Sequence, residues 1–328
     1  MMIPENLIHP KYNELRKLLP AHVHLFRQFF RRIFMSLMIE SDQLAFVTCS
    51  YQPDFERCAR LCASMNIFIS PDVAQFLIVP DRDRALFAQL ESVGRTVISS
   101  EEVLPARFIQ VPLLNKWWFD NAMWPVRGWV MQQITKLCAD VVTNCENIVF
   151  VDSDVEFIRP LQHERFITEG ALRLHRKPMH KSDGVHLKWH HGAGELLDLK
   201  PQYFGSDYVA PLVTWRRSNL VQMKRYIEDC KQRPWYEAVG RRMTVSEYTL
   251  YGVFVEHILG IEQSGHFKQA EDLCHSLWFE DEIEAFFAEF DDTNFPQAVH
   301  LQSNIGMKQA DVNSLMGQLR QNVAPPQL

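Results

Sequence analysis

Short apolar runs alternate with segments of helical period along the first half of the chain. Residues 44–49, 76–79 and 96–98 are apolar runs that end at turn-forming residues, a pattern typical of buried strands. Residues 55–65, between the first two runs, carry apolar side chains at helical spacing. Strand, helix and strand in this order predict βαβ units and a mainly parallel sheet flanked by helices.

The pattern continues less regularly through the middle of the chain. It predicts a helix over 130–142, a strand over 148–151, a strand over 209–214 and a helix over 219–230. About 45 residues after Phe157 hold few periodic signals, so that segment is either functional or contains elements that the pattern does not reveal. Within it we interpret residues 189–194 as a flexible loop, because the local histidine spacing fits no standard zinc motif.

A basic amphipathic segment over residues 21–39 precedes the first strand. It favours a helix packed on the core of the domain over one that lies on an anionic membrane, although both remain open. We expect an N-terminal helical extension over 1–41, a single α/β domain over 42–310 and a tail over 311–328.

The composition mainly argues against certain partners, locations and cysteine roles. The chain has 328 residues and a net charge of -6, which gives no global reason to expect nucleic acid as a partner. No signal peptide or membrane-spanning run is evident, so we expect a cytoplasmic protein whose membrane contact, if any, is peripheral and made by the 21–39 helix. The seven cysteines show no CxxC spacing, which favours reduced thiols over disulfides or a zinc site.

The triplet Asp152-Ser153-Asp154 follows directly on the apolar run 148–151. Ligands of open parallel sheets bind beyond the carboxyl ends of the strands. If the backbone stays extended, the two carboxylates share one side and can approach Mg²⁺ or Mn²⁺, which prefer oxygen ligands and share them with substrate phosphates. The alternative without a functional role is a turn at the end of the strand with two solvated aspartates.

A phosphatase of the haloacid-dehalogenase class also carries two aspartates in this spacing after a strand. In that class the motif lies near the start of the fold, and Thr or Val stands two residues after the second Asp. Here Glu156 occupies that position and three predicted strands precede the motif. The phosphatase alternative is therefore disfavoured.

Several segments together carry a resemblance to a known family. They occur in the family's order and are residues 50–54, 79–83, 128–137, 151–154 and 246–252. Over about residues 44–305 the chain resembles a bacterial family of uncharacterised proteins with a fold like that of GT-A glycosyltransferases, the DUF6492 group.

The resemblance implies a single Rossmann-like GT-A domain, a nucleotide-sugar donor, a Mn²⁺ or Mg²⁺ cofactor, and a saccharide or glycolipid acceptor in surface polysaccharide or glycolipid synthesis. It implies that Asp152 and Asp154 bind the metal and the donor. The other donor-binding positions that it implies follow the first two strands and are Ser50, Tyr51, Asp54, Asp81 and Asp83. Residues 189–194 fall where acceptor loops of such enzymes vary.

Three further residues have two interpretations each. Lys136 either points toward the donor or forms a salt bridge with an aspartate. Glu247 follows a potential helix cap at Ser246 and is either a favourable charge at a helix start or the base that deprotonates the acceptor. His300, in an apolar strand-like run, is either a structural residue or an additional metal ligand.

The leading hypothesis is therefore a metal-dependent glycosyltransferase, with Asp154 and Glu247 as its catalytic residues. A catalytically silent protein that binds a nucleotide or a sugar with the same fold is the main alternative. A nucleotidyltransferase would also use metal-bound carboxylates, but no glycine-rich phosphate loop follows the first strand.

Overall fold

A computed structural model describes residues 43–106, 108–110, 117–178, 184–277 and 296–301, with positions 282, 285–286 and 316. The amphipathic helix predicted over 21–39 lies outside the described residues. So do the extension over 1–41 and, apart from Met316, the tail over 311–328.

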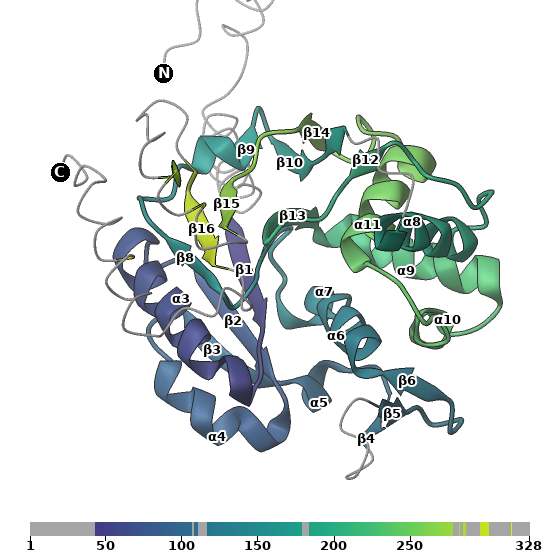
Figure 1. The fold of residues 1–328 in the computed structure, drawn as a ribbon, viewed down its shortest axis with the longest axis horizontal. Helices are drawn as coiled ribbons and strands as arrows, with labels where there is room; N and C mark the ends of the chain where they lie inside the picture. Colours follow the sequence, from purple (N-terminus) through teal and green to yellow (C-terminus); the bar gives the residue numbers. More distant parts are fainter. Residues whose placement is uncertain are drawn as a thin grey trace, which may run out of the picture. The chain divides into compact units, whose positions relative to one another are not determined.

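A five-stranded sheet in the order β13-β7-β1-β2-β3 forms the centre of the described part of the chain (Figure 1). Parallel pairing joins β1 to β2 and β7, and β2 to β3, whereas β13 is antiparallel to β7. The predicted mixed, mainly parallel sheet is confirmed. Its strands are β1 (Leu44–Cys49), β2 (Ala74–Val79), β3 (Arg95–Ser99), β7 (Asn147–Val151) and β13 (Leu212–Arg216).

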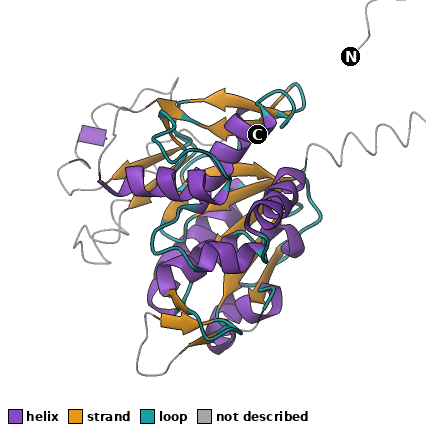
Figure 2. Ribbon diagram, turned by 90° about the vertical axis from the view of Figure 1, so that its right-hand side faces the viewer, coloured by secondary structure: helices purple, strands orange, loops and turns teal. Residues whose placement is uncertain are grey.

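Helices cover both faces of this sheet, as the view at right angles to Figure 1 shows (Figure 2). The helices are α3 (Phe55–Phe68), α4 (Arg84–Phe87), α5 (Ser100–Val103), α6 (Gly128–Lys136), α7 (Ala139–Val142), α8 (Gly184–Leu196), α9 (Arg217–Lys231), α10 (Trp235–Gly240), α11 (Glu247–Phe254) and the π-helix Val255–Leu259.

Alternate side chains of each central strand enter different hydrophobic clusters, because successive residues of a strand point to opposite faces. Phe46 of β1 packs with Leu61 and Met65 of α3. Its neighbour Val47 lies in the cluster that contains Val130 and Ile134 of α6. The apolar runs are therefore continuous because both faces of the sheet are buried.

The helix predicted over 130–142 is divided into α6 and α7. The division occurs where Cys138 N donates to Thr135 O at 3.0 Å, a shorter turn than that of an α-helix. Thr135 Oγ1 also donates to Met131 O at 2.9 Å, a back-bond that bends helices.

The strand predicted over 209–214 begins later, at Leu212. Pro211 has no N–H to donate to the ladder, so the pairing with β7 starts after it. Its carbonyl oxygen accepts from Asp152 N at 2.9 Å.

The interpretation of residues 189–194 as a flexible loop is wrong, because they lie within α8. Its glycines have a packing role: a Cβ on Gly192 would lie 3.0 Å from Thr244 O, and one on Gly194 would lie 3.3 Å from Pro201 Cα. Glycines that permit close packing give the same sequence signal as glycines of a loop.

Several small sheets surround the central one. They contain β4 (Ile109–Gln110), β5 (Trp117–Phe119), β6 (Pro125–Arg127), β8 (Val155–Phe157), β9 (Ile167–Thr168), β10 (Ala171–His175), β11 (Lys177–Pro178), β12 (Ser206–Asp207), β14 (His266–Gln269), β15 (Cys274–Leu277) and β16 (Ala298–Leu301). Antiparallel pairing of β16 with β8 sets His300 opposite Val155. This register brings the end of the described chain to the residues that follow β7.

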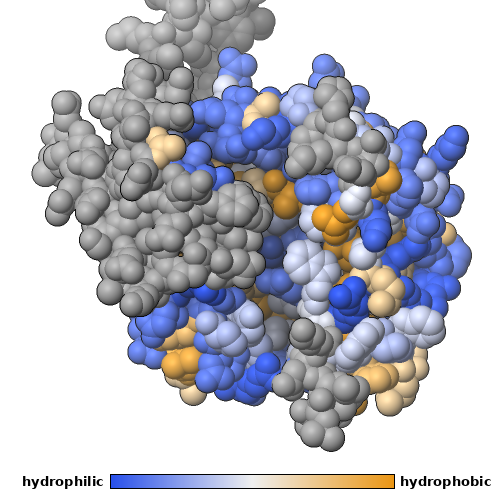
Figure 3. Space-filling model, viewed as in Figure 1, coloured by the Kyte–Doolittle hydropathy of each residue, from blue (hydrophilic) through white to orange (hydrophobic). Residues whose placement is uncertain are grey.

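The surface seen in Figure 3 is mainly hydrophilic, with hydrophobic residues exposed at several places around its middle. Within the described part of the chain, no helix is long and apolar enough to cross a membrane. All seven cysteines are free thiols, as expected.

Glu256, in the π-helix, provides a pH-dependent contribution to stability. Burial acts to raise its pKa, but hydrogen bonds from Arg176, Lys268 and Tyr208 outweigh burial and lower the pKa to about 2. The contribution is therefore present above the pKa of an unfolded glutamate and is lost as the pH falls from about 4.5 toward 2.

We expect Glu256→Gln to lower the free energy of unfolding by about 1–3 kcal/mol at neutral pH, because it weakens charged hydrogen bonds. The difference from the wild type should shrink below about pH 4. Urea unfolding between pH 3 and 7 measures it, and a difference that does not change with pH would contradict the assignment.

Candidate functional site

The parallel strands β1, β2 and β7 end at one edge of the sheet, and the Asp152-Ser153-Asp154 triplet follows β7 there. Its backbone is not extended. Val155 N donates to Asp152 O at 3.2 Å, so the triplet forms a tight turn between β7 and β8. Because of this turn, the two carboxylates contact different elements.

Asp152, whose side chain is 36% exposed, belongs to a polar cluster whose other members, Lys136, Glu247 and Tyr248, are buried. Lys136 Nζ lies 3.1 Å from Asp152 Oδ1, 3.0 Å from Glu247 Oε1 and 2.7 Å from the Tyr248 hydroxyl oxygen. That hydroxyl also donates to Asp152 Oδ1 at 3.4 Å. The structure therefore brings together two sequence-predicted site residues, Asp152 and Glu247, through a third, Lys136.

Lys136 remains charged in this cluster although it is only 7% exposed. Burial acts to lower its pKa, but Asp152 and Glu247 outweigh burial and hold the pKa well above its usual range. The phenol of Tyr248 remains neutral, because burial and then Asp152 raise its pKa.

Two helix ends position this cluster. Lys136 ends α6, where a cation is favourable. Ser246 caps α11, as predicted, since its side chain accepts from Thr249 N at 3.3 Å. Glu247 is then the first residue of α11, and it is only 2% exposed.

Asp154 faces β16 on the other side of the turn. Its Oδ2 lies 3.2 Å from His300 Nε2, and His300 Nδ1 lies 3.2 Å from Ser276 Oγ. Burial acts to lower the pKa of His300, but the hydrogen bond and charge of Asp154 outweigh burial and raise it.

The loop after β1 approaches the same turn. Burial raises the pKa of Asp54, Arg57 lowers it, and the negative charge of Asp154 raises it further, so Asp54 and Asp154 are close enough to repel. Asp54 Oδ1 accepts from Arg57 at 2.5 Å. Ser50 is 7% exposed, whereas Tyr51 is 45% exposed beside it.

The two aspartates after β2 differ in position. Asp83 is 5% exposed, and its Oδ2 accepts from Gln52 N at 3.0 Å, which ties the loop after β2 to the loop after β1. Asp81 is exposed, and its backbone N–H donates to Glu101 at the β3 side. Asp83 thus supports the β1 loop, and Asp81 is not brought to the triplet.

Asp152, Asp154 and His300 offer oxygen and imidazole donors that suit a divalent cation. His300 Nδ1 contacts Ser276 Oγ, and its Nε2 faces the Asp154 carboxylate. Among the described residues, no group of three or more His, Cys, Asp or Glu side chains is arranged so that it could hold a metal ion by itself. A metal ion here would need substrate phosphates and water as further ligands, as Mg²⁺ sites usually do.

A pocket of about 280 Å³ lies beside this site, past the ends of β2 and β3, and not at the triplet itself. Its lining residues are Pro80, Arg82, Glu101, Phe108, Ile109, Gln110 and Trp118. None of the three residues of the candidate metal site lines it.

Sequence reasoning did not identify Tyr248, Arg57 or Ser276. Tyr248 stands next to Glu247 in the resembling segment 246–252, which was the available signal. The partners Arg57 and Ser276 carry no local signal, because their role depends on tertiary contact.

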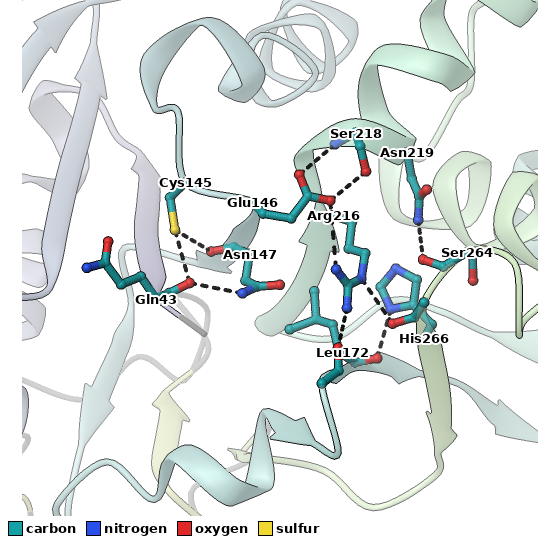
Figure 4. A network of polar contacts seen from close by, with 12 residues as sticks. Gln43, Cys145, Glu146, Asn147, Leu172, Arg216, Ser218, Asn219, Ser264 and His266 are labelled. Atoms are coloured by element: carbon teal, nitrogen blue, oxygen red, sulfur yellow. Dashed lines mark hydrogen bonds and ion pairs between the residues drawn. The ribbon is translucent and has the colours of Figure 1, made fainter. Parts of the chain in front are cut away.

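The opposite edge of the sheet carries a polar network with a different character (Figure 4). Asn147 Nδ2 donates to Gln43 O at 3.0 Å, and Arg216 Nε donates to Gly265 O at 3.0 Å. Its contacts mostly satisfy backbone carbonyls, so this network holds the starts of β1 and β7 and the end of β13 in place.

Comparison with known proteins gives one family match. Residues 43–323 match the family described as "Family of unknown function (DUF6492)". Among curated proteins, none matches the chain.

One similar solved structure is that of an active-site mutant of LgtC. It has 12% sequence identity and a TM-score of 0.42, and the likeness covers 86% of this chain and 98% of that chain. We infer nothing about function from a similarity at this TM-score.

We expect Lys136→Met to lower the free energy of unfolding by about 3–5 kcal/mol, because it leaves Asp152 and Glu247 without their buried cation. Urea unfolding measures the change. Lys188→Met, at an exposed position of α8, is the matched control.

Adding Glu247→Gln to Lys136→Met should recover part of the loss, because one of the two unpaired carboxylates is removed. A Lys136→Met protein as stable as the wild type would contradict the role of this ion pair.

Proposed function

The chain belongs to the DUF6492 family, and we propose that it is a metal-dependent glycosyltransferase that moves a sugar from a nucleotide-diphosphate donor to an acceptor hydroxyl. The observation that carries the proposal is the ion pair of Asp154 with His300 beyond the carboxyl end of β7, with Asp152 two residues away in the same turn. Open α/β sheets bind their ligands at that edge.

The charges of the turn support the requirement for a cation. Asp54 lies close enough to Asp154 for the charge of Asp154 to contribute to the raised pKa of Asp54, and Asp152 belongs to the same turn as Asp154. Arg57, Lys136 and His300 each form an ion pair with one of these carboxylates, so a metal ion would supply the further positive charge that an approaching diphosphate needs.

We assign Asp152, Asp154 and His300 to hold Mn²⁺ or Mg²⁺ together with the donor diphosphate. Such an ion, when bound, supplies a Lewis acid that neutralises the charge developing on the diphosphate leaving group. Ser276 orients the His300 ring, and Lys136 with Tyr248 holds one oxygen of Asp152, which leaves its other oxygen for the ligand.

We assign the nucleotide to the loop after β1. Tyr51 offers an exposed ring for a base or ribose, with Ser50 and Asp54 beside it. Asp83 supports this loop through Gln52 N. Asp81 is exposed and its backbone N–H donates to Glu101, which favours a surface role for it over donor binding.

Glu247 as the general base stays a prediction, and its surroundings favour a different role. Its carboxylate is buried and 3.0 Å from Lys136 Nζ, whereas a base must reach the acceptor hydroxyl. We therefore propose that Glu247 is a positioning residue, which fixes Lys136 and through it Asp152.

Asp154→Asn tests the metal-dependent activity. We expect the release of nucleotide diphosphate from UDP- and GDP-sugars with Mn²⁺ to fall at least about 100-fold, because the charge stabilisation of the leaving group is lost. Asp198→Asn is the matched control, since the Asp198 side chain is 76% exposed. Full activity of Asp154→Asn would refute the proposal.

Binding and turnover measurements together distinguish a catalytically silent binding protein from a glycosyltransferase. If the wild type binds UDP or GDP in calorimetry with Mn²⁺ but releases no diphosphate from any donor sugar, the protein is a binding module and the transferase proposal fails.

Glu247→Gln separates its two roles. If Glu247 is a positioning residue, the substitution should lower the rates of donor hydrolysis and of transfer to an acceptor together, by about tenfold or more. As a base, it would lower transfer and leave donor hydrolysis intact. Steady-state rates of both reactions on one preparation give the ratio that decides between them.

A further inference from the structure

Two tryptophans from different helices form a stacked pair at the surface. The Trp129 ring of α6 and the Trp189 ring of α8 have centroids 6.3 Å apart and planes only 8° apart. Trp129 remains 47% exposed, an unusual state for so large an apolar side chain. This pair takes no part in the cluster around Asp152.

Neighbouring residues fix the position of each ring of the pair. Trp129 Nε1 donates to Val245 O at 3.1 Å, so only the ring faces and edges remain open. His186 packs edge-on against Trp189 with centroids 4.8 Å apart. Its Nδ1 lies 3.8 Å from Asp207 Oδ1, which places a polar pair at the edge of the aromatic surface.

The pair lies on the same face of α6 as the buried cluster. Gln133, one turn on, donates to Trp129 O at 3.1 Å and accepts from Glu247 N at 3.4 Å. Lys136 follows at the seventh position after Trp129, which is about 10 Å along the helix axis. A ligand on the pair is therefore about two helical turns from the residues that contact Asp152.

We infer that the Trp129–Trp189 pair is the acceptor subsite and that it takes a pyranose ring of a saccharide acceptor. The C–H face of a pyranose is apolar and packs on flat aromatic faces, while its hydroxyls need polar groups at the ring edge such as His186 and Asp207. This inference rests on the proposed transferase function, because it names the acceptor class for that reaction.

A lipid surface is the competing occupant. Val185 and Met243 are 47% and 57% exposed, and Met243 O accepts from Arg127, two residues before Trp129. A fixed ring pair edged by an imidazole and a carboxylate favours a sugar over acyl chains, which need no polar partner at that edge.

The test uses the full-length protein and the methyl glycosides of galactose, glucose, mannose and N-acetylglucosamine. Saccharide binding is followed by saturation-transfer NMR, and acceptor-dependent transfer is followed beside donor hydrolysis. Trp189→Ala should weaken binding of the preferred glycoside about tenfold and raise its KM similarly, with a much smaller change in kcat. The ratio of transfer to donor hydrolysis should fall accordingly at low acceptor concentration.

Trp124→Ala is the matched control. Trp124 is also an exposed tryptophan, 46% exposed, but it packs against Arg241 and not in the pair. Trp129→Phe keeps a ring and should retain more binding than Trp129→Ala, and circular dichroism confirms that each variant is folded.

Three outcomes would overturn the inference. The first is equal glycoside binding by Trp189→Ala and the wild type, and the second is no binding of any glycoside by the wild type. The third is a Trp189→Ala variant that loses binding to anionic phospholipid vesicles but binds glycosides as the wild type does. Donor hydrolysis by the wild type tests the transferase proposal separately. If it occurs while the pair variants behave as the wild type, only the acceptor subsite is wrong.

Discussion

A single buried ammonium group organises the candidate site. Lys136 lies between Asp152 and Glu247, so it joins the turn after β7 to α6 and to the start of α11. Removing these charges from water is costly, and the cost is offset only when each charge has close partners. The conformation of the triplet is thereby coupled to the packing of two helices that carry no candidate metal ligand themselves.

The second constraint comes from the sheet pairing beyond this turn. β16 pairs with β8, and this pairing delivers His300 to Asp154 from 146 positions later in the chain (300 minus 154). Asp152 is therefore fixed by helices and Asp154 by strands. The space between their carboxylates depends on both packings, so a defect in either changes the geometry offered to a ligand.

Much of the fold follows from local pattern. The apolar runs predict β1, β2 and β7 because their central residues are buried on both faces, and Gln75 and Asn147 are polar residues near the starts of β2 and β7. Pattern failed at α8, where glycines serve packing, and at the start of β13, where Pro211 delays pairing. The first failure arises from tertiary packing, which hydrophobic periodicity does not record, and the second from the missing N–H of Pro211, a local feature outside the hydrophobic pattern.

The candidate site divides in the same way. Asp152 and Asp154 can be identified because they follow a strand, and Ser246 because capping is local. The contact of Lys136 with Tyr248 joins residues 112 positions apart, and no spacing rule predicts it. The turn conformation, in which the aspartates face different elements, also had to come from the structure.

Binding of a nucleotide diphosphate and transfer of its sugar place different electrostatic demands on this site. Under the proposed function, a nucleotide diphosphate that binds beside these ion-paired carboxylates brings negative charge that a cation would offset, whether or not its sugar is transferred. Cation-dependent nucleotide binding is therefore expected of a transferase and of a silent binding protein alike. What distinguishes a transferase is stabilisation of charge that appears only as the glycosidic bond breaks, and only turnover of a sugar donor reports that difference.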